Sequence, residues 1–160
     1  MTTAFLGLGS NLGDRRANLE AAIEALDWGD TRVHARSSIY DTDPVGGPDD
    51  QPAFLNMVIA VATTLGARGL FERVVGVEIA LGRDRFNEVR WGPRTIDIDI
   101  LTFGSTVIDE PDLQIPHPRI AERAFVLVPL AEIAPDLDVP GMGRVADLVE
   151  RVARAGVRPV

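Results

Sequence analysis

The chain has 160 residues, of which 46% are hydrophobic and 25% charged, and its formal net charge is −8. This composition predicts a folded globular protein and excludes a disordered one. Cysteine is absent, which excludes disulfides, thiolate nucleophiles and zinc–thiolate sites and favours a reducing, cytoplasmic location. The acidic balance argues against nucleic-acid binding, and the longest apolar stretch, 57–62, is far too short for a membrane helix.

All 16 basic residues are arginine, so the chain lacks the lysine that a P-loop or Schiff-base chemistry requires. Four of these arginines fall between Arg83 and Arg94. A local arginine cluster in an acidic chain indicates a small anionic ligand. A solvated loop with salt bridges explains the cluster equally well when it is considered alone.

The expected elements follow the order strand, helix, strand, strand, helix, strand. Strands are predicted at 4–8, 31–40, 54–65 and 95–103, with helices ending near residue 26 and spanning 67–81. This is the order of a ferredoxin-like α+β sandwich, one antiparallel sheet covered by two helices. Beyond residue 104 we expect a short hairpin, a short helix after residue 123 and a last helix near 145–155. Without repeats or a linker, residues 1–160 are expected to form a single domain.

Two segments, 41–53 and 83–93, are irregular and longer than ordinary connections need. Loops of this length are often functional, and we expect both to border a binding site.

A pair of aspartates gives the clearest chemical signal. In the predicted strand 95–103, Asp97 and Asp99 share one face and three isoleucines share the other. The two aspartates lie about 6–7 Å apart along a strand, close enough for both carboxylates to reach one cation. Mg²⁺ is the natural candidate because it binds one or two carboxylates together with water and phosphate oxygens. A strand with an exposed polar face is the alternative.

The glycine-rich start does not predict a dinucleotide-binding site. Gly7 and Gly9 fit the first two glycines of a G-x-G-x-x-G motif, but the third position is Leu12. We interpret 9–14 as a tight turn from strand to helix, with Ser10, Asn11 or Asp14 as the helix cap. We therefore expect arginine side chains to bind phosphate, and the candidates are Arg83, Arg85 and Arg94.

Aromatic residues make up only 6% of the chain, so their positions are informative. Phe54, Trp91 and Phe125 lie in or beside the segments with candidate polar residues, and two such rings would hold a flat heterocycle between them. Core packing is the alternative for each ring taken alone. His117 lies between two prolines in a stiff turn, where its imidazole is suited to donate to a phosphate oxygen.

These residues belong to motifs that occur in a recognisable order. The motifs are Gly9-Ser10-Asn11-Leu12-Gly13, Asp50-Gln51-Pro52, Phe54-Leu55-Asn56, Glu78, Arg90-Trp91-Gly92-Pro93-Arg94-Thr95-Ile96-Asp97-Ile98-Asp99, Pro116-His117-Pro118 and Arg123-Ala124-Phe125. Over nearly its whole length the chain resembles the hydroxymethyldihydropterin pyrophosphokinase family.

The resemblance implies ATP as co-substrate, two Mg²⁺ ions on Asp97 and Asp99, and catalytic roles for both aspartates with Arg83 and Arg94. It implies closure of the two long loops over small-molecule substrates, and we expect a monomer. The residues implied for the pterin are Thr42, Pro44, Val45, Phe54, Asn56, Trp91, Asp97 and Phe125. Those implied for ATP are Glu78, Arg83, Arg85, Trp91, Arg94, Ile100, His117 and Arg123.

The chain departs from the family pattern at Asp112 and Gln114, where some members carry a basic residue. It also departs at Phe86, where members of the family can carry a lysine. Two other readings stay open on the residues alone. Another Mg²⁺-dependent phosphoryl or nucleotidyl transferase with this fold would need the aspartates and arginines but not the two phenylalanines. A non-catalytic ferredoxin-like binding module would need none of them.

Overall fold

The structure is a computed structural model that describes residues 1–47, 50–83, 92 and 94–160. A central antiparallel sheet contains β1 (Thr2–Ser10), β2 (Thr31–Arg36), β3 (Tyr40–Thr42), β4 (Phe54–Thr63), β5 (Asp97–Phe103) and β10 (Val157–Pro159). The helices are α1 (Arg15–Leu26), α2 (Ala67–Ala80), α3 (Ala124–Ile133) and α4 (Val145–Arg151), with a 3-10 turn η1 (Ile120–Glu122) before α3. Two small hairpins pair β6 (Ile108–Glu110) with β7 (Leu113–Ile115) and β8 (Asp138–Val139) with β9 (Gly143–Arg144).

The sheet confirms the predicted α+β topology. Strand β1 lies between β4 and β5, and β2 pairs with β4 on its other edge, with every pairing antiparallel. The helix α1 joins β1 to β2, and α2 joins β4 to β5, which completes the ferredoxin-like order.

The predicted strand 31–40 is divided into two. Residues 37–39 face only two residues of β4, because Arg36 pairs with Ile59 and Tyr40 with Asn56. The one extra residue interrupts the ladder, as in a β-bulge. Ser37 holds the interruption in place, since its backbone N–H donates to the carbonyl of Val58 at 2.8 Å and its hydroxyl accepts from the Val58 N–H at 2.9 Å.

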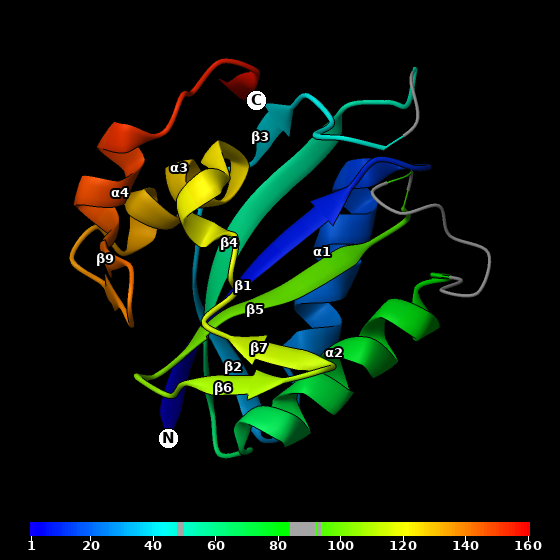
Figure 1. The fold of residues 1–160 in the computed structure, drawn as a ribbon. Helices are drawn as coiled ribbons and strands as arrows, with labels where there is room; N and C mark the ends of the chain where they lie inside the picture. The colour runs from blue at the N-terminus through cyan, green and yellow to red at the C-terminus, as the bar shows by residue number, and fades with distance from the viewer. Residues whose placement is uncertain (48–49, 84–91, 93) are drawn as a thin grey trace.

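The two faces of the sheet bury separate apolar clusters. Leu6 of β1 and Ile59 of β4 pack with α1 and α2, whereas Val58 and Leu101 pack with α3 and α4 on the opposite face. Figure 1 shows α3 and α4 gathered on one side of the molecule and α1 and α2 on the other. The C-terminal third of the chain therefore forms a third layer, which the prediction of a two-layer sandwich did not include.

The remaining element boundaries agree with the predictions to within a few residues. The hairpin β6–β7, the helix after Arg123 and the last helix are all present, although α4 ends at Arg151 rather than near residue 155. The hairpin β8–β9 and the strand β10 were not predicted. Over the residues described, no helix has the length and apolar character needed to cross a bilayer.

Candidate active site

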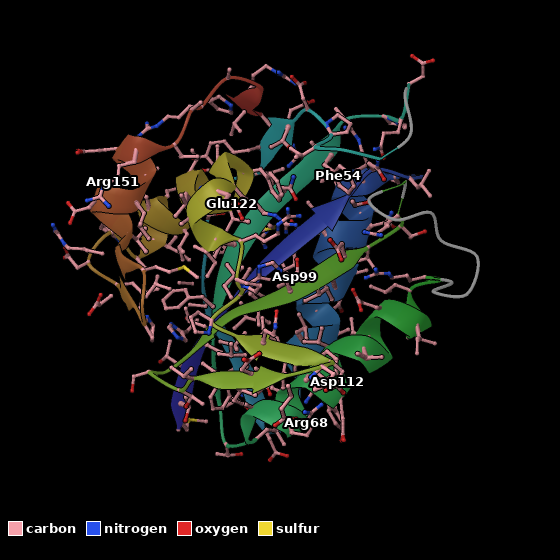
Figure 2. All side chains as sticks on the ribbon, viewed as in Figure 1. Phe54, Arg68, Asp99, Asp112, Glu122 and Arg151 are labelled. Atoms are coloured by element: carbon pink, nitrogen blue, oxygen red, sulfur yellow. The ribbon has the colours of Figure 1, made fainter. Side chains whose placement is uncertain are left out.

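A cleft of about 530 Å³ opens at one end of the sheet, on the face that carries α3. Figure 2 shows Phe54, Asp99 and Glu122, from three separate segments, around this region. The lining side chains come from β3, β4, β5, the segments that flank them, the stretch before α3 and the first turn of α3. They are Thr42, Asp43, Val45, Phe54, Asn56, Arg83, Arg94, Asp97, Asp99, His117, Arg119, Glu122, Arg123 and Phe125.

The alternation predicted for β5 is confirmed. Ile96, Ile98 and Ile100 are buried in the cluster with α1 and α2, while Asp97 and Asp99 line the cleft on the opposite face. The two carboxylates are therefore held together by strand geometry rather than by a flexible loop.

The floor between these aspartates and β4 is made of glycine. Gly9 of β1 pairs with Asn56 on one side and Asp97 on the other, and directly opposed residues in antiparallel strands share a face. A methyl group on Gly9 would come within 2.5 Å of the Asn56 side-chain oxygen. Gly9 lies inside β1, which runs to Ser10, and not in the predicted turn. Because Gly9 has no side chain, it leaves space between the Asn56 amide and the Asp97 carboxylate.

The aspartate pair is electrostatically strained without a cation. Burial raises the pKa of Asp99 to about 7, and the neighbouring charge of Asp97 adds to the rise. A divalent cation between the two carboxylates would relieve both effects. Within the described part of the chain no group of three or more His, Asp or Glu residues is arranged to hold a metal ion. Two carboxylates fit Mg²⁺, which takes its other ligands from water and phosphate.

Arg83 lies between two carboxylates at the inner wall of the cleft. Its Nη1 contacts a carboxylate oxygen of Glu78 and lies 3.0 Å from Oδ1 of Asp97. Glu78 is fully buried on α2 and also accepts the backbone N–H of Ile98 at 2.9 Å. Glu78 thus fixes both the guanidinium and the strand that carries the aspartates. Its predicted contact with the nucleoside stays a prediction.

Asn11 connects the two segments that border the cleft. Its side-chain oxygen accepts the backbone N–H of Arg94 at 2.7 Å, and its amide nitrogen donates to Gln51 and to the carbonyl of Pro52, at 3.2 and 3.0 Å. Of the three predicted caps of α1, Ser10, Asn11 and Asp14, the structure has Asp14, which accepts the N–H of Ala17 at 3.1 Å. Because Asp14 caps the helix, the Asn11 side chain can bridge the two segments instead.

Two phenylalanines line the cleft from different layers. Phe54 begins β4, and Phe125 lies in the first turn of α3, where the Arg123 guanidinium sits 5.4 Å from its ring centre. The predicted ring pair is therefore present in one cavity, and neither ring is among the fully buried core residues.

A polar edge lies beside Phe54. Asn56 donates to the hydroxyl of Thr42 at 2.6 Å, and both side chains are almost completely buried. Val45 lines the cleft and is 67% exposed, whereas the predicted contact residue Pro44 lies next to it without lining the cavity. This arrangement is suited to hydrogen-bonding the edge of a planar ring.

His117 accepts one hydrogen bond and, as a neutral imidazole, has one N–H left to donate. Burial lowers its pKa to about 4, and the charge of Arg123 contributes. Its Nδ1 accepts the N–H of Arg119 at 3.1 Å, so the remaining proton is on Nε2.

A second cavity of about 280 Å³ shares Asp99 and His117 with the cleft. It is lined by the predicted residue Ile100, and by Asp112 and Gln114 of the β6–β7 hairpin. Asp112 accepts from Arg68 of α2 at 2.7 Å, which ties the hairpin to that helix (Figure 2).

The cleft gathers most of the predicted site, with some differences. Arg85 and Trp91 lie outside the described residues, so nothing follows for them. The sequence analysis missed three lining residues, Asp43, Arg119 and Glu122. The available signal was their proximity in sequence to Thr42, His117 and Arg123, which are lining residues themselves.

The raised pKa of Asp99 predicts an effect on stability. Because the pKa of Asp99 in the folded protein lies above the ordinary 3.8, protonation of this carboxyl stabilises the fold. The stabilisation is complete below pH 4 and is lost as the pH rises through about 7. We expect Asp99→Asn to raise the melting temperature of the metal-free protein at pH 8, with the gain disappearing toward pH 4. Asp138→Asn, at an exposed position on β8, is the control. A gain that is the same at every pH would contradict the electrostatic account.

Comparison with known proteins identifies the family of the chain. The family model described as 7,8-dihydro-6-hydroxymethylpterin-pyrophosphokinase matches residues 5–135. Relatives named 2-amino-4-hydroxy-6-hydroxymethyldihydropteridine pyrophosphokinase include one from Methylorubrum extorquens, 51% identical over 88% of each chain. Another, from Pseudomonas aeruginosa, is 42% identical over 96% of this chain and 93% of the relative.

Solved structures with the same fold include the Plasmodium falciparum HPPK-DHPS wild type with SDX-DHP, at a TM-score of 0.71 and 16% identity. The match covers 94% of this chain but only 43% of that longer one. The fold and the sequence comparisons thus agree, and the chain belongs to the 7,8-dihydro-6-hydroxymethylpterin pyrophosphokinase family.

Proposed function

We propose that this enzyme transfers pyrophosphate from Mg-ATP to the hydroxymethyl oxygen of 6-hydroxymethyl-7,8-dihydropterin, giving the pterin diphosphate and AMP in a step of folate biosynthesis. The observation that carries this proposal is that one cleft contains an aspartate pair, arginines and two phenylalanines together. A general phosphoryl transferase accounts for the charged residues but gives no reason for two rings in the same cavity.

The pterin is assigned to the half of the cleft near β3 and β4. Phe54 and Phe125 would stack on its two faces, and Asn56 and Thr42 would hydrogen-bond its edge. The backbone around Pro44 and Val45 completes this edge in the proposal. The hydroxymethyl group then points toward Asp97, across the floor left open by glycine.

ATP is assigned to the opposite half. Arg83, Arg94 and Arg123 present guanidinium groups to the triphosphate, and the Nε2–H of His117 donates to a phosphate oxygen. The smaller cavity beside Ile100 is proposed for the nucleoside, because it opens from the cleft at Asp99 and His117. Arg85 and Trp91 are proposed to join ATP and pterin contacts from the closing loop.

Two Mg²⁺ ions are proposed on Asp97 and Asp99, which would hold them from one strand face. Bound Mg²⁺ would neutralise phosphate charge and lower the pKa of the attacking hydroxyl group. The protein's own contribution is positioning: the ring pair and the arginines place the hydroxyl in line with the β-phosphorus. The new bond joins the hydroxymethyl oxygen to the β-phosphorus, and AMP leaves with the bridging oxygen. We assign uptake of the hydroxyl proton to Asp97.

Further parts of the proposal rest on the sequence. Residues 1–160 are proposed to act as one pyrophosphokinase domain, as a monomer and in the cytoplasm. The two long loops are proposed to close over both substrates and exclude water, which would suppress hydrolysis of ATP.

The proposal predicts the nucleotide product. Incubation with Mg-ATP and reduced hydroxymethylpterin should yield AMP in step with pterin diphosphate, and Asp97→Ala or Asp99→Ala should lower turnover at least about a hundredfold. Both variants should remain folded, because each removes one member of a repelling pair. Separation of nucleotides by ion-exchange chromatography, with circular dichroism as the folding control, measures both results. Formation of ADP instead of AMP would contradict the proposed reaction.

The ring pair predicts selective loss of pterin binding. Phe125→Ala removes one stacking face and should weaken the pterin by about 1–3 kcal/mol, with a smaller effect on an ATP analogue. Isothermal titration calorimetry with each ligand separates the two effects, and Phe125→Leu controls for lost volume. Equal weakening of both ligands would indicate that Phe125 serves the core.

The glycine floor predicts a steric effect. Gly9→Ala should displace Asn56 and raise the Kd for the pterin at least about tenfold, because its methyl group would meet the amide oxygen. Gly7→Ala is the matched control on the same strand, since its methyl group would meet only Leu101 side-chain atoms at 3.5 Å or more. Unchanged pterin binding in Gly9→Ala would contradict the assignment of the floor.

A further inference from the structure

The last strand of the chain pairs with the strand that carries part of the cleft wall. Val157, Arg158 and Pro159 of β10 pair with Thr42, Asp41 and Tyr40 of β3. The C-terminal segment 156–160, which contains β10, lies beyond the region matched by the family model, which ends at residue 135.

Arg158 joins both residues that flank Thr42. Its Nη2 lies 2.9 Å from a carboxylate oxygen of Asp41 and 2.9 Å from one of Asp43. The backbone adds a third connection, since the N–H of Asp43 donates to the carbonyl of Gly156 at 2.8 Å. These three interactions hold the segment 41–43 in addition to its strand pairing with β10.

This segment reaches the cleft directly. Thr42 and Asp43 both line it, and the hydroxyl of Thr42 accepts the hydrogen bond from Asn56 at 2.6 Å. Thr42 also pairs with Phe54, the first residue of β4. A short chain of contacts therefore runs from Arg158 through Asp41 and Asp43 to the three side chains assigned to the pterin.

Close packing at Gly156 makes the connection sensitive. Gly156 has a φ of +82°, and a methyl group there would lie 2.8 Å from a carboxylate oxygen of Asp43. Only glycine fits this approach without displacing the aspartate.

Charge favours the same arrangement. Asp43 lies on the rim of a cleft that already contains Asp97 and Asp99. Without a cationic partner, Asp41 and Asp43 would add negative potential at the entrance for anionic substrates. Arg158, which does not line the cleft, offsets both charges from β10.

We propose that Arg158 is a positioning residue for the pterin half of the active site, acting through Asp41 and Asp43 on Thr42 and Asn56. This inference rests on the proposed function and adds the C-terminal segment 156–160 to the site. It assigns no substrate contact to Arg158 itself.

Arg158→Ala in the 160-residue enzyme tests the proposal. We expect the Kd and KM for hydroxymethylpterin to rise about fivefold, a modest effect because the ion pairs are solvent-exposed. The Kd of an ATP analogue and kcat should stay within about twofold, and Arg158→Lys should restore most of the pterin affinity. Gly156→Ala should reproduce the same pattern without removing the charge, because it displaces Asp43.

Arg144→Ala is the matched control, since the Arg144 side chain is about as exposed as that of Arg158 and pairs with Asp136, and neither residue lines the cleft. Unchanged pterin affinity in both Arg158→Ala and Gly156→Ala would overturn the inference. Equal weakening of pterin and ATP would also overturn it, because that result indicates general destabilisation. Wild-type enzyme that produces no AMP would instead contradict the proposed function, so the two failures are distinguishable.

Discussion

The repulsion between Asp97 and Asp99 is the constraint around which the cleft is arranged. Strand alternation holds both carboxylates on one face of β5, and burial already raises the pKa of Asp99 to about 7. The charges of Arg123 and Arg83 moderate this cost by lowering the pKa of Asp99, whereas the charge of Glu78 adds to the rise. Arg83 contacts Asp97, and buried Glu78 fixes Arg83 and the backbone of Ile98 together. The remaining imbalance favours a divalent cation. In the proposed function, metal and phosphate would offset the cost of holding the two carboxylates together.

The two faces of the sheet have different tasks. The face toward α1 and α2 is filled with apolar side chains and holds the strands in register. The opposite face is apolar only where α3 and α4 cover it, and toward its other end it exposes glycine, amide and carboxylate groups. The C-terminal third supplies the second wall, with His117, Arg123 and Phe125 opposite the strands. The added layer therefore completes the cleft rather than merely enlarging the core.

Local patterns predicted the parts of the site that depend on local geometry. The shared face of the two aspartates was predicted from the alternation of side chains along a strand. The position of α2 was predicted from the spacing of its apolar residues and the glycine after it. Features that depend on pairing between distant segments were missed. The role of Gly9 requires knowing that Asn56 and Asp97 are its two neighbours. The strand β10 has only three residues and no apolar pattern, so its position follows from pairing with β3. Arg85 was predicted from the arginine cluster and Trp91 from the positions of the few aromatic residues, and both lie outside the described residues.

Crystallographic location of the metal tests the central claim most directly. Crystals of the enzyme with Mn²⁺, a non-hydrolysable ATP analogue and hydroxymethylpterin would give anomalous scattering from the metal, and Mn²⁺ shares the preference of Mg²⁺ for oxygen ligands. The account predicts two anomalous peaks, each about 2.0–2.2 Å from an oxygen of Asp97 or Asp99 and from a phosphate oxygen. Metal bound to the nucleotide alone, with both aspartates free of it, would contradict the account.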